Sequence, residues 1–225
     1  MLEKLIQGRF IDLDIKVLNV KPPALANAAI KPPHGSFVDS TVLALSLQQS
    51  VSEKTGIFSH SKTSAFAPGV NAAKVHRNFH WLKWIPPYTA QIPLGGVDIL
   101  TGPMSGCWVI PYRWPGTAAT DPIHVGHLGT CGNKEWDDGM KAGWNQFAAN
   151  HPNALISGFQ PNRAFANDLD VGPGEFTNIF ALVTPDRRYH AVKLGRVGIQ
   201  GSKFRIVKVK EVTPTVGAAL QTIFA

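Results

Sequence analysis

The stretch "FTNIFALVTPDRRYHAVKLG", residues 176–195, decides the fold class. Two runs rich in β-branched and aromatic residues flank Pro185 and Asp186, residue types that favour a tight turn. This pattern predicts two strands joined as a hairpin. A third run of the same kind, "KFRIVKVKEV" at 203–212, follows closely. We therefore expect the C-terminal third of the chain to form antiparallel sheet.

Further short strands are predicted nearer the N-terminus. Alternating apolar residues indicate one strand near 9–19, and "ALISGF" at 154–159 is typical of a buried strand. Three more follow one another closely: "GGVDILTG" at 95–102, "SGCWVIPYRW" at 105–114 and "PIHVGHLGT" at 122–130. The second and third of these are predicted to pair as a hairpin with a long loop.

One segment has a clear helical pattern. Residues 133–152 begin at a possible N-cap, Asn133, and place four large apolar residues on one face. These are Trp136, Met140, Trp144 and Phe147. We interpret the stripe as core packing. Residues 39–56 could form a second helix, but "TVLALSL" within them fits a strand equally well.

Strands outnumber helices in this pattern, which favours an α+β domain with a mainly antiparallel or mixed, sandwich-like sheet core flanked by helices. A length of 225 residues fits a single domain, 1–225. We expect residues 91–213 to form the core and residues 1–90 an N-terminal arm that frames it. Residues 57–92, rich in Ser, Pro, Ala and His, are expected to be irregular and to cover a site.

Composition narrows the class of protein. Apolar residues make up 44% of the chain and charged residues 16%, which excludes a disordered chain. The net charge of +7 favours an acidic partner, but the basic residues are scattered, which argues against nucleic-acid binding. No stretch approaches the length of a membrane span. The N-terminus lacks the apolar core of a secretory signal, so we expect synthesis in a cytosol and, if the protein is exported, no cleaved signal.

The chain has two cysteines, Cys107 and Cys131. A lone cysteine is most often a packing residue, but "MSGC" places Ser105 and Gly106 directly before Cys107. The glycine permits close approach of a substrate, and backbone N–H groups of this turn could hold an oxyanion. Thr101 ends the preceding strand, where its hydroxyl could line the same pocket. We expect Cys131 to be inert.

Histidines follow Cys107 on the partner strand of the predicted hairpin, within reach of its side chain. A thiolate and an imidazolium form a minimal acyl-transfer site, in which the imidazolium lowers the pKa of the thiol. His124 and His127 are three residues apart, so they point to opposite faces of a regular strand unless Gly126 introduces a bulge. Either histidine could be the partner on spacing alone.

The run "LTGPMSGC" and the later "HLGT" resemble the glutamine deamidases of the cytotoxic necrotizing factor and lethal-factor toxin group, which are related to the chemotaxis receptor deamidase CheD. That group carries a Leu-Ser-Gly-Cys motif, with Met104 in place of the Leu here. The resemblance covers mainly residues 95–131. It favours His127 as the catalytic base and assigns a site position to Thr101.

The resemblance implies a toxin or effector that acts in a host cytosol without a cofactor. Cys107 would attack the carboxamide of a glutamine in a host protein, such as a small GTPase or a translation factor. His127 would protonate the departing ammonia and then activate water. Attack by an amine instead of water would give transglutamination. We expect such a protein to be monomeric.

Three other functions remain open on the sequence. A thiol protease would use the same Cys–His pair. A zinc site could use His76 and His80, but only on a helix, and neither has an acidic neighbour. A non-enzymatic binding module could use exposed aromatics, namely Trp81, Trp84 and Tyr88. We expect His151 and His190 to be ordinary surface or edge residues.

Overall fold

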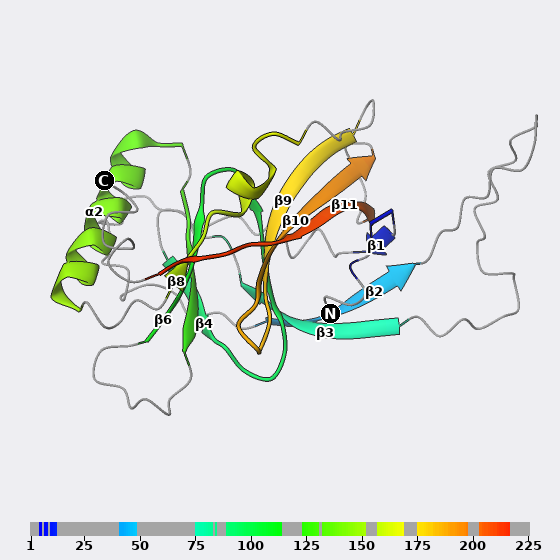
Figure 1. Ribbon diagram of the computed structural model, residues 1–225, viewed down its shortest axis with the longest axis horizontal. Coiled ribbons are helices and arrows are strands. Elements are labelled where there is room, and N and C mark those ends of the chain that lie inside the picture. The colour runs from blue at the N-terminus through cyan, green and yellow to red at the C-terminus, as the bar shows by residue number, and fades with distance from the viewer. Residues whose placement is uncertain are drawn as a thin grey trace, which may run out of the picture.

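The computed structural model describes residues 5, 7–8, 10–12, 41–48, 75–82, 84, 89–113, 123–130, 132–151, 157–168, 175–197 and 203–216. Within these ranges the chain forms a sheet-rich core with one α-helix (Figure 1). The prediction of a strand-dominated domain is confirmed at this level. We expected several flanking helices, but the described residues form only that single α-helix and one short 3-10 helix.

Strands β1, β2, β3, β5, β9, β10 and β11 close into a barrel in the order β1-β11-β10-β9-β5-β3-β2. Their bounds are Phe10–Asp12, Thr41–Gln48, Val75–Leu82, Ile99–Met104, Glu175–Val183, Tyr189–Val197 and Lys203–Glu211. Neighbouring strands are antiparallel except β3 and β5, which are parallel. The sheet of the sequence prediction is therefore rolled into a barrel.

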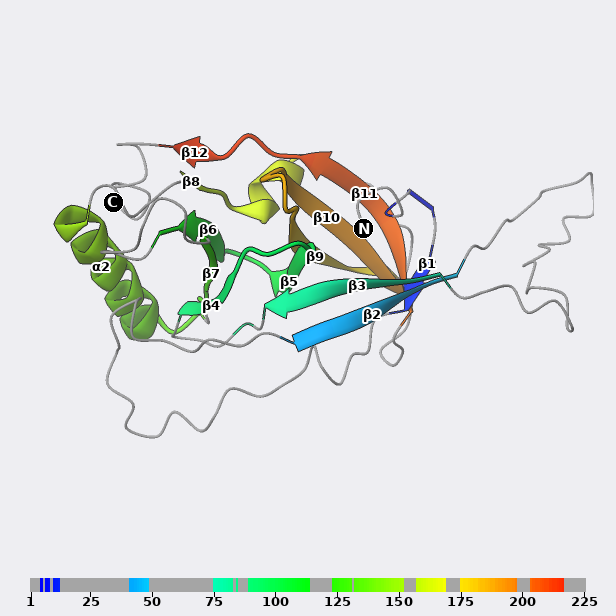
Figure 2. The ribbon, with the colours of Figure 1, turned by 90° about the horizontal axis from the view of Figure 1, so that it is seen from below.

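A second sheet lies beside the barrel. It has the order β4-β7-β6, with bounds Thr89–Pro93, His124–Leu128 and Trp108–Tyr112. The predicted hairpin between residues 105–114 and 122–130 is confirmed as the antiparallel pair β6–β7. Helix α2, Lys134–Asn150, follows β7 and lies against the face of this sheet that points away from the barrel (Figure 2). Two short strands, β8 (Ser157–Gly158) and β12 (Thr215–Val216), pair separately.

Three apolar clusters fill the layers. The barrel interior holds side chains such as Trp81, Phe180 and Leu182. The space between the barrel and the second sheet holds residues of opposite parity on the same strands, such as Leu82 and Ala181. Strands β3, β5 and β9 thus bury side chains on both of their faces, which explains the continuous apolar run at residues 179–183 of β9.

The third cluster lies between the second sheet and α2. Met140, Trp144 and Phe147 of the predicted helical stripe pack there against Tyr112, with ring contacts close to perpendicular. The interpretation of the stripe as core packing is confirmed for these three residues. The side chain of Trp136 lies outside the described residues.

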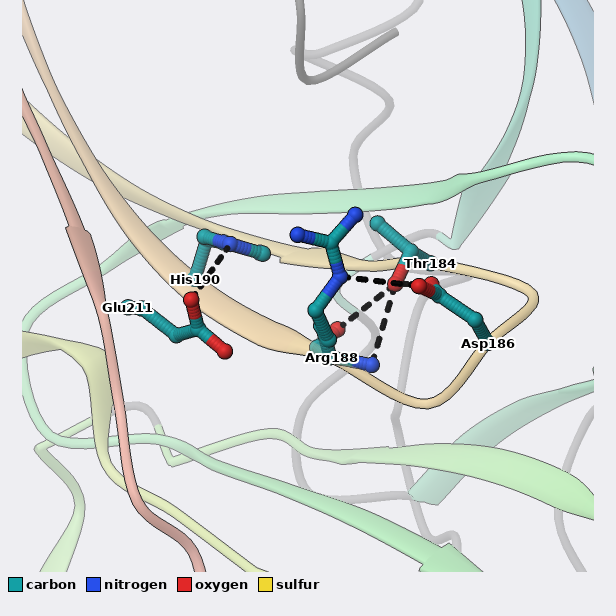
Figure 3. A network of polar contacts seen from close by, with 5 residues as sticks. All are labelled: Thr184, Asp186, Arg188, His190 and Glu211. Carbon is teal, nitrogen blue, oxygen red and sulfur yellow. Dashed lines mark hydrogen bonds and ion pairs between the residues drawn. The ribbon is translucent and has the colours of Figure 1, made fainter.

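The turn between β9 and β10, expected at Pro185 and Asp186, is confirmed and carries a polar network (Figure 3). The Thr184 hydroxyl contacts the Asp186 carboxylate and accepts a hydrogen bond from the Arg188 N–H at 3.0 Å. The Arg188 side chain pairs with Asp186 at 2.8 Å. Arg187 adopts the left-handed conformation that closes the turn, with φ of 63°.

Three expectations for the N-terminal segment need correction. Residues 41–48 form strand β2, so the helical alternative for 39–56 is wrong there. Residues 75–82 form strand β3, so the expectation of an irregular segment over 57–92 is wrong for that part. We expected residues 1–90 to frame the core as an arm, but their strands β1, β2 and β3 belong to the barrel itself. The predicted strand at 9–19 is seen at Phe10–Asp12, and the rest lies outside the described residues.

Candidate active site

The β6–β7 pairing decides which histidine shares a face with Cys107. The register runs without a shift from His124 opposite Tyr112 to His127 opposite Val109, so Gly126 introduces no bulge. Residues directly opposite each other point to the same side of a sheet. Val109 points towards the barrel, so His127 does as well. His124 points towards α2, where its ring lies 6.2 Å from the Tyr112 ring.

Cys107 lies two residues before Val109 and belongs to the same buried cluster between the barrel and the second sheet. Cys107 and His127 are therefore diagonal neighbours on one face, a separation at which long side chains can meet. In the structure the thiol is engaged elsewhere: Sγ lies 3.4 Å from Thr130 Oγ1 and 3.9 Å from the Thr130 carbonyl oxygen. The thiol would have to turn from Thr130 towards the ring to reach it.

Thr101 fixes the ring of His127 from behind. The residue ends the regular pairing of β5 with β9, and its hydroxyl is completely buried. Oγ1 lies 2.7 Å from the Leu82 carbonyl oxygen and 2.6 Å from His127 Nδ1. We expected Thr101 to line the pocket beside Cys107, but it contacts the far side of the histidine instead.

The proton positions in this contact follow from the number of donors. A hydroxyl has one proton, and a carbonyl oxygen can only accept. Thr101 therefore donates to Leu82 and accepts from Nδ1–H of His127. The other ring nitrogen, Nε2, then carries a lone pair, and it is buried without a hydrogen-bond partner among the described residues. A histidine held in this tautomer can accept a proton at Nε2.

Burial sets the charge state of the pair. It lowers the pKa of His127 to about 3, so the ring is neutral at physiological pH. Burial also raises the pKa of the Cys107 thiol, while hydrogen bonds from the Thr130 side chain and from the Thr130 and Gly106 backbone oppose that rise. We expected an imidazolium that lowers the thiol pKa. The structure shows a neutral thiol and a neutral imidazole, which is the arrangement for general-base activation.

A pocket of about 460 Å³ opens beside Cys107. Its walls combine apolar and uncharged polar side chains, and none of the described residues that line it carries a charge. They include Trp84, Met104, Ser105, Thr130, Asn162 and Ile179. The indole N–H of Trp84 donates to the Thr130 carbonyl oxygen at 3.0 Å, which ties the pocket wall to the residue that holds the thiol.

Ser105 and Gly106 form the bend between β5 and β6, as expected of a turn that leads into the cysteine strand. Ser105 is exposed at the pocket, and Gly106 is half-buried. Thr130 lies next to Gly106, because a Cβ at Gly106 would lie 3.8 Å from Thr130 Oγ1. Glycine therefore keeps the space beside the thiol open.

The other candidate residues are placed as follows. Trp81 is 1% exposed and points into the barrel, so it cannot belong to a binding surface. Tyr88, Cys131 and the side chain of His76 lie outside the described residues. His76 and His80 stand on strand β3, so the helix that a zinc pair would need is absent. Within the described part of the chain, no group of three or more His, Cys, Asp or Glu side chains could hold a metal ion.

Of two further histidines that we expected at the surface or an edge, His190 differs from expectation. His190 is 3% exposed and lies 3.9 Å from the Glu211 carboxylate, so it is a buried residue rather than a surface one (Figure 3). Burial lowers its pKa, and Glu211 opposes that shift. His151 is half-buried beside Phe147, with ring centroids 5.1 Å apart. Neither histidine belongs to the group around Cys107.

No protein-family model, no curated protein and no solved structure matches this chain. No helix in the described ranges is long and apolar enough to cross a bilayer.

Proposed function

We propose that Cys107 and His127 form the catalytic pair of a thiol amidohydrolase that acts on a protein glutamine side chain. The observation that supports this most is the Thr101–His127 contact, which leaves Nε2 as an unpartnered base on the face that Cys107 shares. Ser105, Gly106 and Cys107 resemble the motif of the deamidase toxins, and the proposal joins that resemblance to this geometry.

The pocket supports a carboxamide as the substrate group. Its described lining offers apolar walls for a short aliphatic stem and uncharged polar groups for the amide. A charged side chain would lose its hydration there without gaining a counter-ion, which costs free energy. The glutamate product carries such a charge, so the same lining would favour its release.

In the proposed reaction, the Cys107 thiol turns from Thr130 and gives its proton to His127 Nε2 as the sulfur attacks the amide carbon. A C–S bond forms, and the tetrahedral oxyanion collapses by breaking the C–N bond. The proton on His127 goes to the leaving ammonia. His127 then removes a proton from water, which cleaves the thioester and restores the thiol. Because both partners are neutral at rest, proton transfer occurs during the attack.

The test uses a library of glutamine-containing peptides and a panel of candidate host proteins, including small GTPases and a translation factor. We expect a mass gain of roughly one dalton with release of ammonia, and no cleavage of the chain. Cys107→Ala and His127→Ala should abolish this gain, whereas His124→Ala should not. Cleaved chains would identify a protease, and incorporation of an added fluorescent amine would identify a transglutaminase.

A further inference from the structure

The 3-10 helix η3 (Pro161–Phe165) and the residue before it hold the turn at Cys107 through two side-chain amides. Gln160 Nε2 donates to the carbonyl oxygen of Gly106 at 2.8 Å. Asn162 Nδ2 donates to the carbonyl oxygen of Ser105 at 2.9 Å. These carbonyls belong to the two consecutive peptide groups on either side of Gly106, so both peptide planes are fixed from the same direction.

The direction of the carbonyls sets that of the backbone donors. In a trans peptide group the N–H points opposite to the C=O. With both carbonyls turned towards η3, the N–H groups of Gly106 and Cys107 point away from it, towards the side of the thiol. In agreement, a hydrogen bond from the Gly106 backbone stabilises the thiolate of Cys107 and opposes the rise of its pKa. Two adjacent N–H groups beside a nucleophile are the donors that an oxyanion needs.

The segment that carries these amides is itself anchored on the barrel. Lys210 Nζ donates to the Ala164 carbonyl oxygen at 2.7 Å, and Lys193 Nζ donates to that of Asp168 at 2.9 Å. The Asp168 carboxylate pairs with Lys210 at 2.7 Å and with Lys208 at 3.2 Å. Strands β10 and β11 thus hold η3 in place, and supporting contacts of this kind keep a site within its working geometry.

We propose that Gln160 and Asn162 are positioning residues, which aim the N–H groups of Gly106 and Cys107 at the oxyanion formed when Cys107 attacks a carbonyl carbon. The inference rests on the proposed function, since it assumes acyl chemistry at Cys107. A carbonyl that accepts a hydrogen bond also polarises its peptide group, which strengthens donation by the N–H on the other side. Gln160 is not among the described residues that line the pocket, whereas Asn162 is, so Gln160 gives the cleaner test of a positioning role.

Two thiol reagents separate this role from a structural one. With iodoacetamide, the sulfur attacks a CH₂ carbon, a C–S bond forms, iodide leaves and the thiol proton passes to solvent. No oxyanion forms. With p-nitrophenyl acetate, the C–S bond forms at a carbonyl carbon through an oxyanion, the C–O bond breaks, and p-nitrophenolate leaves while His127 takes the thiol proton. Only the second reaction should depend on Gln160 and Asn162.

The experiment measures both rates at Cys107 by peptide mass, in the full chain, with Cys107→Ala as the background. We expect Gln160→Ala and Asn162→Ala each to slow acetylation about tenfold, less than the loss of a whole oxyanion donor. Alkylation should stay within about twofold of the unchanged protein, since it has no oxyanion to stabilise. Gln160→Glu should act like Gln160→Ala, because a carboxylate cannot donate to the Gly106 carbonyl. Arg163→Ala is the matched control: this exposed side chain of η3 lies over the Trp108 ring and should change neither rate.

The outcomes are separable. Slower acetylation with unchanged alkylation supports the positioning role. If both rates fall together, or neither falls, the inference is overturned while the Cys107 site stands. If p-nitrophenyl acetate does not acetylate Cys107 in the unchanged protein, the proposed function fails and the inference fails with it. Circular dichroism of each variant shows whether the fold is retained, and a variant that unfolds is replaced by its conservative form, Gln160→Met or Asn162→Leu.

Discussion

The two faces of the β4–β7–β6 sheet differ in their packing and in the hydrogen bonding of their polar groups. On the face towards α2, aromatic rings pack edge to face and the Trp144 indole N–H donates to Thr89 at 2.9 Å. On the face towards the barrel, His127 is completely buried, and its Nε2 has no hydrogen-bond partner among the described residues. One face of this small sheet therefore stabilises the fold, and the other carries the residues that we propose to be reactive.

The largest expected effect is on the face of the sheet that packs against α2. Trp144→Ala removes a fully buried ring and leaves the Thr89 hydroxyl without its donor. We expect a loss of about 3–5 kcal/mol in the free energy of unfolding. Urea denaturation followed by circular dichroism measures this, and Trp144→Phe should cost less. A loss below about 1 kcal/mol would show that α2 contributes little to the stability of the sheet.

The second effect compares the two histidines of β7. His127→Ala should slow acetylation of Cys107 by p-nitrophenyl acetate by at least about 100-fold, because the base that takes the thiol proton is lost. His124→Ala should leave the rate within about threefold, because its ring lies on the α2 face. Stopped-flow absorbance of p-nitrophenolate gives both rates. A larger loss of rate with His124→Ala than with His127→Ala would show that the base lies on the face of the sheet towards α2.

The third expected effect concerns the tautomer of the His127 ring. Thr101→Val keeps the shape of the side chain but removes the hydroxyl that accepts from Nδ1–H. The ring is then free to carry its proton on Nε2, and we expect acetylation to slow about tenfold. Thr101→Ser should restore most of the rate. Equal loss in both variants would mean that the contact is needed for packing alone.

The fourth effect is the pH dependence of the free energy of unfolding. The pKa of His127 is about 3 in the folded protein, below the ordinary value of 6.5, so the unfolded chain binds one more proton between these values. Stability that is present above pH 6.5 is therefore lost as the pH falls towards 3, with a slope of up to about 1.4 kcal/mol per pH unit from this residue. His124 and His190, whose pKa values burial also lowers, add to the slope.

Urea titrations between pH 7 and 4 measure this slope. His127→Gln should flatten it, since the variant has no group that titrates at that position. Surface charge changes with pH in the same way in both proteins, so the difference between their slopes isolates His127. Identical slopes would mean that the pKa of His127 is the same in the folded and the unfolded state.

The strands could be predicted from sequence where alternation and turn residues agreed. Pro185 and Asp186 marked the β9–β10 hairpin, and the apolar stripe with Met140 and Trp144 marked α2. Closure of the barrel could not be predicted, because β1 pairs with both β2 and β11 through backbone hydrogen bonds that leave no pattern in the side chains. The parallel pairing of β3 with β5 could not be predicted from the sequence for the same reason.

For the proposed site, the sequence indicated Cys107 with either His124 or His127, and the resemblance to the deamidase toxins favoured His127. The β6–β7 register places His127, and not His124, on the face of Cys107. The charge state was mispredicted, since burial on both sides of His127 depends on how the barrel docks against the sheet. Gln160 and Asn162 lie 54 and 57 residues from the carbonyls they contact, and nothing local marks them. Thr130 is part of the sequence motif "HLGT", but the sequence did not indicate that it would contact Cys107 Sγ.

The barrel seam has a consequence for biosynthesis. Phe10 lies opposite Arg205, so β1 pairs with a strand that is translated much later. Contacts this distant in the chain form late, and this pairing cannot form before residue 205 has emerged from the ribosome. The anchor of η3 also needs Lys208 and Lys210 on that same strand. A nascent chain would thus contain Cys107 and His127 before the barrel that packs against them has closed.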